Sequence, residues 1–352
     1  MPASSLIDAL HKVVQHRADL TREHACAAMT EILEGQATDA QIAAFAATLA
    51  MKGETVEELV GFATAIRQHS TLMDETGAEE YLAGTERDAL VDTCGTGGDA
   101  SSTFNISTAT AFTIAGAGVR VAKHGNRAVT SRCGSADVLE QLGINIEAPP
   151  ARMARAIREI GIGFLFAPAI HHAMKYAAPA RRELRLRTVF NMLGPLTNPA
   201  GATVQIVGVY ETSVVRKLAR ALKELGLRRG FVVHGDDGLD EITVTSQTLV
   251  AEIGDNGVQT YFIAPEDFGL SRAKLEDLSG GDACENAGLV REILAGKPGA
   301  RRDVVLANAA AALFAAGRAK DFRHGVELAA ESLDSGAAAA KVEELVAFSH
   351  SQ

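Results

Sequence analysis

The 352-residue chain lacks the features of a membrane-bound or secreted protein. None of its apolar runs approaches the roughly 18–20 residues that a transmembrane helix needs. The stretch from Met1 to Asp8 has neither the basic region nor the apolar region of a signal peptide. Hydrophobic residues make up 47% of the chain and charged residues 22%, as in soluble globular proteins. We therefore expect a cytoplasmic protein with no membrane partner.

Cysteine is scarce, and basic residues do not outnumber acidic ones. The four cysteines are far apart and in no metal-ligand spacing: Cys26, Cys94, Cys133 and Cys284. We interpret them as reduced thiols of a cytosolic protein, which argues against a disulfide framework and a cysteine-based metal site. The net charge of −10 argues against a nucleic-acid partner.

The basic residues that are present concentrate in one segment. Residues 120–187 hold 12 Lys and Arg against 5 Asp and Glu, a local charge of +7 inside an acidic chain. Such a segment favours a focused site for a small anion. The alternative is a solvated helix face, and Arg152, Arg155 and Arg158, which are spaced three apart, fit that alternative better.

The first seventy residues have the pattern of a helical unit. Thr38–Gln41 and Thr55–Glu58 both fit the capping box, in which a hydroxyl and an acid or amide satisfy free N–H groups at a helix start. Ile42, Phe45 and Leu49 then form one apolar stripe at helical spacing. The stripe predicts packing or a subunit contact rather than a ligand site.

From about residue 90 the pattern changes to short β-rich runs that alternate with helical stretches. The runs cover residues 89–91, 119–122, 163–166, 204–209 and 230–234, and one helix is predicted over 213–225. This alternation is typical of an α/β fold with a mostly parallel sheet. In such sheets ligands bind at the carboxyl ends of the strands.

The length of the chain exceeds the roughly 250–300 residues at which single cores stop growing, so we expect two domains. A basic helical stretch over 169–187 is expected to fold back onto the N-terminal helices. The predicted division is a small helical domain of residues 1–72 with 169–189, and a large α/β domain of residues 73–168 with 190–352.

The loop Asp92–Asp99 is rich in glycine and is followed by the polar stretch Asn105–Thr108. Its glycines lack a Cβ, so the backbone can contact a ligand and turn its N–H groups toward oxyanions. The polar stretch stands where a helix is expected to begin, and the N–H groups and dipole of a helix N-terminus favour a phosphate. An ordinary N-cap explains Asn105 or Ser107 alone, but not the whole group after a Gly-rich turn.

A second loop gathers donor side chains into ten residues. These donors are Lys123, His124, Asn126, Arg127, Ser131 and Arg132. Gly125 and Gly134 give this loop the flexibility to close over an anion. Because the two loops are about one βαβ unit apart, together they imply a ligand that carries phosphate at both ends.

A dinucleotide fold is the first alternative, since Gly95–Ala100 satisfies the pattern G-x-G-x-x-G/A. The fingerprint should open a helix directly, whereas the helix here is predicted to begin only near Asn105. The second strand ends in Lys123, where a ribose-binding acid is expected. The dinucleotide interpretation is therefore rejected.

Four carboxylates lie within six residues after the predicted strand 231–233, namely Asp236, Asp237, Asp240 and Glu241. Mg²⁺ takes one or two carboxylates and completes its shell with water or phosphate oxygens. Alone, the cluster is better explained as a solvated turn. Because two phosphate loops are predicted nearby, a metal-binding role becomes more plausible for Asp240 and Glu241. Residues 236–238 are still interpreted as a turn.

His171 and Arg181 both fall in the predicted basic helix. Ten residues make nearly three helical turns, so the two side chains would share roughly one side. The planar fork of Arg181 can pair with a carboxylate. A lone arginine on a helix is more often a surface residue, so the pairing needs other support.

These motifs, in this order, resemble the anthranilate phosphoribosyltransferase family. The motifs that carry the resemblance are Asp92–Asp99, Lys123–Arg127, Gly134–Asp137, Phe190–Pro199 and the triplet Glu285–Ala287. The resemblance covers essentially the whole chain, and the ten-residue motif Phe190–Pro199 is its most specific part.

The resemblance implies a fold of the nucleoside phosphorylase and phosphoribosyltransferase kind, with a small discontinuous all-helical domain, a large α/β domain and a homodimer joined through the helical part. It also implies transfer of phosphoribose from phosphoribosyl pyrophosphate (PRPP) to the amine of anthranilate, in tryptophan biosynthesis. PRPP would bind to Gly95, Gly98, Asp99, Thr103, Asn105, Ile106, Ser107, Thr108, Lys123, His124, Gly125, Asn126, Arg127, Ala128, Val129, Thr130, Ser131 and Ser135.

The family's metal and anthranilate roles also map onto this sequence. Two Mg²⁺ ions per subunit would be held by Ser107 at one ion, Asp240 at the other and Glu241 at both. Anthranilate would contact Gly95, Asn126 and Arg181, with His171 near its entry path. Two positions depart from the family: Cys133 replaces a common serine and His172 a small residue or proline. Neither is expected to carry chemistry, and the departures leave open how the loop closes and how the mouth of the anthranilate path is shaped.

The implied chemistry needs no strong general base, because an arylamine is already neutral near pH 7. The leaving pyrophosphate needs charge neutralisation, which magnesium and backbone donors supply. A ribosyl cation-like transition state gains from nearby oxyanions. We therefore predict catalysis by positioning and electrostatics, with no covalent nucleophile.

Two other functions are compatible with parts of the pattern. A pyrimidine nucleoside phosphorylase shares the fold and the second loop, but has no reason to carry the motif Phe190–Pro199. A non-catalytic relative that binds nucleic acid predicts a basic groove and loss of the acidic pair, whereas this chain is acidic and keeps Asp240 and Glu241.

Overall fold

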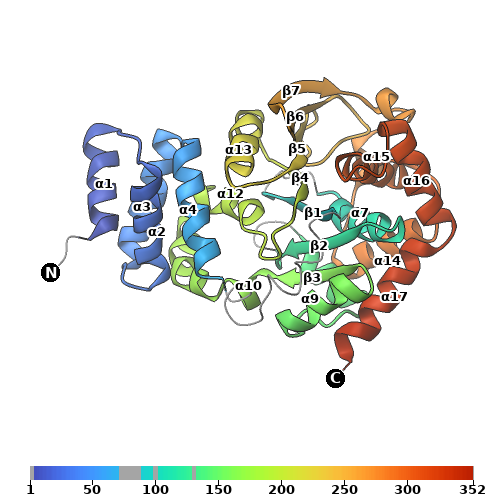
Figure 1. The fold of residues 1–352 in the computed structure, drawn as a ribbon, viewed down its shortest axis with the longest axis horizontal. Helices are drawn as coiled ribbons and strands as arrows, with labels where there is room; N and C mark the ends of the chain where they lie inside the picture. Colours follow the sequence, from blue (N-terminus) through green and yellow to red (C-terminus); the bar gives the residue numbers. More distant parts are fainter. Residues whose placement is uncertain (1–3, 71–88, 98–101, 129–131, 352) are drawn as a thin grey trace.

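The computed structural model describes residues 4–70, 89–97, 102–128 and 132–351. Its N-terminal part is a bundle of α1 (Ser5–His16), α2 (Arg22–Leu33), α3 (Asp39–Lys52) and α4 (Val56–Gln68). Each helix starts at a Ser or Thr whose side chain accepts a hydrogen bond from the first turn. Both capping boxes predicted from the sequence, at Thr38 and Thr55, are confirmed. The bundle lies at one end of the molecule (Figure 1).

The rest of the chain is built on a seven-stranded sheet with the order β3-β2-β1-β4-β5-β6-β7. The strands are β1 (Leu90–Gly95), β2 (Arg120–Gly125), β3 (Ile162–Phe166), β4 (Val204–Gly208), β5 (Arg229–Gly235), β6 (Thr248–Gly254) and β7 (Gly257–Ile263). The first five are parallel, which confirms the predicted mostly parallel α/β sheet. β6 and β7 add an antiparallel hairpin that the sequence analysis did not predict.

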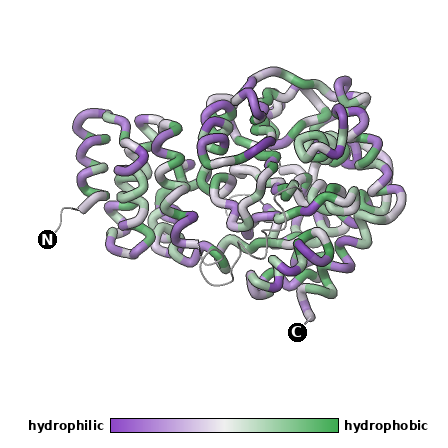
Figure 2. The backbone as a smooth tube through the Cα atoms, viewed as in Figure 1, coloured by the Kyte–Doolittle hydropathy of each residue, from purple (hydrophilic) through white to green (hydrophobic). Residues whose placement is uncertain are grey.

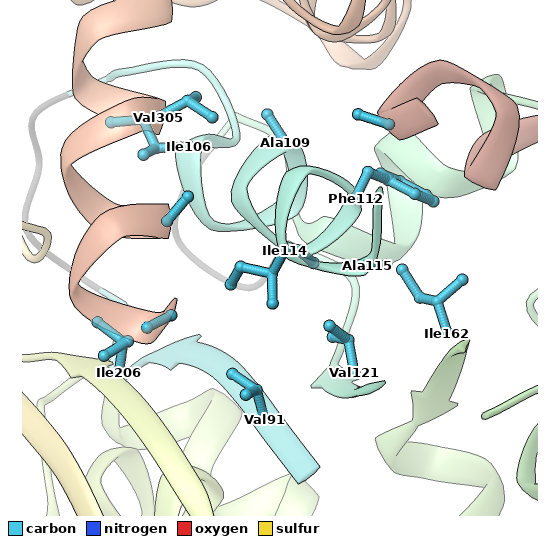
Figure 3. Packing of buried hydrophobic residues seen from close by; sticks show 14 of the residues in the cluster. Val91, Ile106, Ala109, Phe112, Ile114, Ala115, Val121, Ile162, Ile206 and Val305 are labelled. Atoms are coloured by element: carbon cyan, nitrogen blue, oxygen red, sulfur yellow. The ribbon is translucent and has the colours of Figure 1, made fainter. Parts of the chain in front are cut away.

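Helices cover both faces of the sheet, because alternate strand residues point to opposite sides. One core lies under α7 (Ile106–Gly116) and α15 (Ala300–Ala315) and takes Ile206 and Phe231 from the sheet. Figure 3 shows α7 above Val91 and Val121. The same core is closed by α8 (Ser135–Gln141), α9 (Pro150–Glu159), α14 (Ala283–Leu294), α16 (Phe322–Asp334) and α17 (Ala337–His350), with the 3₁₀ turns η3 (Pro265–Phe268) and η4 (Leu275–Leu278).

The other face takes the alternate residues Val207 and Val232 into a second core with α13 (Thr212–Glu224). This core continues without a break into the N-terminal bundle. Figure 2 shows hydrophilic and hydrophobic residues interspersed along the outer helices, as expected for helices with one buried face. No helix in the described part of the chain is long and apolar enough to cross a membrane.

Between the bundle and the sheet lie four short elements, α10 (Ala167–Ile170), η2 (His172–Ala177), α11 (Ala178–Leu184) and α12 (Val189–Leu196). Ala177, Ala180 and Val189 share the core of α1–α4. The prediction of one continuous helix over 169–187 is wrong. Pro179 stands in the first turn of α11, where its missing N–H favours a helix start over a continuation.

Candidate active site

The two predicted loops meet at the carboxyl end of the sheet. The first follows β1, and the second follows β2, the neighbouring parallel strand. Five of the predicted PRPP ligands lie outside the described residues, namely Gly98, Asp99, Val129, Thr130 and Ser131. The remaining predicted ligands stand on β1, on α7 and the turn before it, and on the stretch from β2 to the start of α8.

A buried carboxylate ties the two loops together from below. Asp92 is fully buried, and its Oδ1 accepts a hydrogen bond from the His124 backbone N–H at 3.1 Å. Its Oδ2 accepts from Asn198 Nδ2 at 2.8 Å and from Gln205 Nε2 at 3.3 Å. Burial raises the pKa of Asp92, while Asn198 and nearby Lys123 oppose that rise. Asp92 therefore fixes the spacing between the strands and is not exposed to a ligand.

The sequence analysis missed Asn198 and Gln205 as site residues. Asn198 belongs to the specific motif Phe190–Pro199, and its Nδ2 also donates to the Ala122 carbonyl at 2.9 Å. The motif thus anchors the strand ends that carry both loops. Gln205 lies on β4 and is a polar residue in an otherwise apolar strand, which is the sequence signal that could have identified it.

Lys123 reaches from β2 toward the start of α7. Its Nζ is buried and donates to the Thr93 carbonyl at 2.7 Å and to Ser107 Oγ at 3.3 Å. Burial lowers the pKa of Lys123, while the charges of Asp92, Cys94 and Glu241 raise it. Lys123 therefore places a positive charge beside Ser107, and Glu241 lies within electrostatic reach of it.

The predicted acidic pair lies over the same edge. A Cβ on Gly95 would stand 2.8 Å from Asp240 Oδ2, and a Cβ on Gly208 would overlap the Asp240 carbonyl oxygen. Asp240 therefore lies directly against the ends of β1 and β4, where only glycine leaves it room. Asp237, in contrast, accepts from Leu239 N at 3.1 Å and Thr243 Oγ1 at 2.6 Å, as a turn residue does.

The described side chains alone do not form a complete metal shell at this edge. Within the ranges that the structure describes, no group of three or more His, Cys, Asp or Glu side chains is arranged to hold a metal. Two carboxylates and a hydroxyl fit Mg²⁺ only if substrate oxygens and water complete the octahedron.

The first turn of α7 has no side-chain cap, although Asn105 stands at the N-cap position. The Asn105 side chain turns away from the helix. Its Oδ1 accepts from Asn286 Nδ2 at 2.9 Å, and its Nδ2 donates to the Cys133 carbonyl at 3.4 Å. The alternative of Asn105 as an ordinary N-cap is therefore wrong.

The second loop is held closed at its base. Asp137 Oδ2 accepts from the backbone N–H groups of Ala128 and Gly134, both at 2.9 Å. A Cβ on Gly134 would overlap the Ala128 nitrogen. Ser135 Oγ donates to the Asn126 carbonyl at 3.4 Å. Asp137 therefore joins the two described sides of this loop.

Arg127 pairs with helix α8 in this structure. Its guanidinium donates to Asp137 at 3.1 Å and to Glu140 at 2.9 and 3.0 Å. Hydrogen bonds to Glu140 and Asp137 raise the pKa of Arg127, and the bond to Arg127 lowers the pKa of Glu140. In this arrangement the guanidinium is directed at α8, and the PRPP contact of Arg127 stays a prediction.

His124 and His171 bring the second loop against the segment after α10. Their ring centroids are 5.2 Å apart at an interplanar angle of 70°. Each is only 7% exposed. Among the described residues, His124 Nε2 and both ring nitrogens of His171 have no hydrogen-bond partner. Burial lowers the pKa of His124 to about 4 and that of His171 to about 3, so both rings are neutral near pH 7.

Arg181 lies on α11 with its guanidinium carbon 5.4 Å from the centroid of the Phe190 ring. Burial lowers the pKa of Arg181. With the described residues it forms no ion pair. The predicted shared helix face with His171 is wrong, because His171 stands in the break between α10 and η2 with φ −98° and ψ 55°. The two residues belong to different elements of the region between the bundle and the sheet.

Comparisons with known proteins agree with this geometry. Residues 87–339 match the family model described as "Glycosyl transferase family, a/b domain", and residues 7–70 match "Glycosyl transferase family, helical bundle domain". The chain is 53% identical over 346 residues to an anthranilate phosphoribosyltransferase of Citrifermentans bemidjiense, which covers 97% of this chain and 98% of that protein.

Two solved structures are similar over nearly the whole chain. The anthranilate phosphoribosyltransferase of Thermus thermophilus is 41% identical with a TM-score of 0.90, over 99% of this chain and 100% of that one. The enzyme of Saccharomyces cerevisiae in complex with PRPP and Mg is 27% identical with a TM-score of 0.86, over 99% and 98% of the two chains.

Proposed function

We propose roles for the site residues from one premise: the chain belongs to the anthranilate phosphoribosyltransferase family, and it transfers the phosphoribosyl group of PRPP to the amine of anthranilate with release of pyrophosphate, in tryptophan biosynthesis. The observation that carries these roles is the meeting of both loops and the acidic pair at one sheet edge. There Asp240 lies against Gly95, and Lys123 lies against Ser107.

PRPP, in this proposal, spans the two loops. The backbone of Gly95–Asp99, Thr103 and the open start of α7 at Asn105–Thr108 bind one of its phosphorylated ends. The loop Lys123–Ser131, with Ser135, binds the other. The buried amino group of Lys123 supports this assignment, since it donates to the Thr93 carbonyl and to Ser107 Oγ and so lies between the two loops.

Two Mg²⁺ ions per subunit complete the PRPP site in this proposal. Ser107 and Glu241 hold one ion, and Asp240 and Glu241 hold the other. When bound, magnesium neutralises the pyrophosphate as it leaves. The incomplete protein shell among the described residues supports a metal that binds together with PRPP, because phosphate oxygens supply the missing ligands.

Anthranilate binds on the side of Arg181 and the two histidines. The guanidinium of Arg181 pairs with the carboxylate, because a largely buried cation without an ion-pair partner among the described residues gains most from a bound anion. Asn126 and Gly95 contact the aromatic amine, and His171 lines the approach. The neutral imidazoles of His124 and His171 leave the arylamine uncharged and nucleophilic. No side chain forms a covalent bond to ribose.

The subunits associate through the helical bundle as a homodimer. The outer surface of α3 exposes Ala40, Ala44 and Met51 at helical spacing, and α1 beside it exposes Val14. Met51 is 85% exposed, which is unusual for a large apolar side chain. The small helical domain consists of residues 1–72 with 169–189, and the dimer forms in the cytoplasm.

The reaction is tested by following the loss of anthranilate fluorescence with PRPP and Mg²⁺, with and without EDTA. Loss that needs both PRPP and Mg²⁺ is expected. Phosphorolysis of thymidine or uridine in place of this reaction would identify a pyrimidine nucleoside phosphorylase instead.

The number of ions is tested by calorimetric titration of Mg²⁺ in the presence of pyrophosphate. Two ions per subunit are expected for the wild type and one for Asp240→Asn. Asp237→Asn is the matched control, because Asp237 stabilises a turn in the same segment, and it should keep both ions. A stoichiometry of one in the wild type would contradict the two-ion assignment.

A further inference from the structure

The start of α7 is open because the one side chain that can cap it is held elsewhere. Asparagine is among the best N-cap residues, and a free Asn105 would bond the N–H groups of the first helical turn. Two of these groups already have backbone partners, since the Ile106 N–H donates to the Phe104 carbonyl at 2.8 Å and the Thr108 N–H to the Asn105 carbonyl at 3.1 Å. Among the described residues, the Ser107 N–H is the first-turn group left for a side-chain cap or a ligand. In the structure neither polar atom of the Asn105 amide serves the helix, since Oδ1 faces Asn286 and Nδ2 faces the Cys133 carbonyl.

Asn286 is placed and held for this contact. It lies in the first turn of α14 and is 1% exposed. Its Oδ1 accepts from the Gly281 N–H at 2.7 Å, which fixes its amide so that Nδ2 points at Asn105. A Cβ on Gly280 would stand 2.7 Å from Asn286 Oδ1 and 2.6 Å from the Phe104 nitrogen, so the backbone before α14 packs directly against the turn before α7. Phe104 N donates to the Leu278 carbonyl at 3.2 Å and closes that contact.

We infer that Asn286 is a positioning residue that prevents Asn105 from capping α7 and so keeps the Ser107 N–H available to a phosphate of PRPP. The inference rests on the proposed function, because it requires PRPP to bind at this helix. Asn286 is hydrogen-bonded to the predicted ligand Asn105. It acts by removing an intramolecular competitor from the site.

The competition gives the inference a distinctive energetic signature. Without Asn286, the Asn105 side chain is free to occupy the Ser107 N–H that the phosphate needs. PRPP must then displace this side chain, which weakens PRPP binding by about five-fold. This factor is the usual stabilisation by an N-cap residue, about 1 kcal/mol, expressed as a ratio of binding constants. Removal of Asn105 as well removes the competitor. A double-mutant cycle therefore separates competition from general damage.

The experiment measures PRPP binding calorimetrically, with Mg²⁺, for the wild type, Asn286→Leu, Asn105→Ala and the double variant. Leucine has nearly the shape of asparagine but no donor. Asn286→Leu should bind PRPP about five-fold more weakly, with kcat and the KM of anthranilate nearly unchanged. The double variant should bind PRPP as Asn105→Ala does. Asn286→Asp cannot donate to Asn105 Oδ1, but it can accept from Asn105 Nδ2 after the Asn105 amide rotates, so it should lose less than Asn286→Leu.

Three outcomes overturn the inference while leaving the proposed function intact. One is wild-type affinity in Asn286→Leu, and another is an additive loss in the double variant, which marks a purely structural role. The third is a larger loss in Asn286→Asp than in Asn286→Leu. If Asn286→Leu fails to fold, Asn286→Ala carries the same comparison with a smaller side chain. Failure of the wild type to bind PRPP would instead refute the proposed function.

Discussion

At the scale of single residues, the site is marked by buried polar groups without partners. Buried polar atoms in proteins nearly always have hydrogen-bond partners, so exceptions gathered in one place point to a ligand. His124 and His171 lie in contact and leave three ring nitrogens unpaired among the described residues. Arg181 adds a largely buried cation stacked on Phe190. Elsewhere, the buried cation Lys52 has an ordinary partner, because its Nζ forms an ion pair with Glu58 at 3.0 Å.

Replacement of Arg181 tests the anthranilate side of the site. Arg181→Ala should raise the KM of anthranilate by about 10- to 100-fold, which corresponds to the loss of a hydrogen-bonded charge pair of roughly 1.5–3 kcal/mol. The KM of PRPP should change little. Arg182→Ala is the matched control, since Arg182 is the more accessible neighbour on the same helix. Equal increases in both KM values for Arg181→Ala would refute the assignment.

The two buried histidines predict a loss of stability in mild acid. Their folded-state pKa values of about 4 and about 3 lie below the ordinary value of 6.5, so the unfolded state binds more protons as the pH falls. Their contribution is therefore complete above pH 6.5 and is lost progressively toward pH 4. His171→Leu should reduce the slope of unfolding free energy against pH in this range by about one proton, or ~1.4 kcal/mol per pH unit. Urea unfolding at pH 7, 6 and 5 measures both slopes, and identical slopes would contradict the prediction.

At the scale of elements, the sequence predicted what local patterns determine and missed what tertiary contacts determine. Caps and apolar periodicity identify α3, α4 and the five parallel strands, because these signals are local. The β6–β7 hairpin also had a local signal, Asn256-Gly257 between two β-rich runs, which was overlooked. The break in the helix at His171 had a weaker local signal, the prolines Pro168 and Pro179 on either side of it.

The candidate site divides in the same way. The position of the two loops at the carboxyl edge of the sheet was predictable, since both follow parallel strands, while their contacts with phosphate stay predictions. The residues that hold those loops were not predictable, because Asn198, Gln205 and Asn286 reach them from distant parts of the chain. Only their contact with Asp92 or Asn105 in the folded chain reveals their role.

Arg67 predicts how the helical bundle is fastened to the rest of the molecule. Its guanidinium donates from α4 to the Leu196 carbonyl at 2.8 Å and the Leu225 carbonyl at 3.1 Å, at the C-terminal ends of α12 and α13. Each bond joins a largely buried cation to the negative end of a helix dipole. Arg67→Ala should lower the free energy of unfolding by about 2–4 kcal/mol in urea titrations.

The matched control for Arg67 is Arg22, which also links the bundle to α13. It pairs with Glu57 at 3.0 Å and Glu224 at 3.3 Å, but these groups are exposed. Because exposed ion pairs contribute about 0–1 kcal/mol, Arg22→Ala should change the unfolding free energy much less than Arg67→Ala. A larger loss for Arg22→Ala would show that charge pairing, rather than the buried helix ends, fastens the bundle.

At the scale of the whole molecule, the carboxyl edge of the sheet and the N-terminal helical bundle carry different surfaces. The charged loops lie at the carboxyl edge of the sheet. The bundle, at the left end of the molecule in Figure 1, exposes apolar side chains on α1 and α3. The second core runs without a break from the sheet through α12 into the bundle. The proposed interface on α1 and α3 would therefore be linked to the site through packed helices rather than through a flexible tether.

The assembly is tested at the most exposed apolar side chain of that surface. Met51→Lys should convert a dimer into a monomer in sedimentation experiments at micromolar concentration, because a buried interface cannot solvate the new charge. The helical circular dichroism should not change, since Met51 is 85% exposed and supports no core. Phe262→Lys is the matched control: Phe262 is 54% exposed on β7, away from the bundle, and its replacement should leave the dimer intact. A monomeric wild type would contradict the proposed dimer, and dissociation by Phe262→Lys alone would place the interface elsewhere. Dissociation by Met51→Lys alone would assign the interface to the outer face of α3.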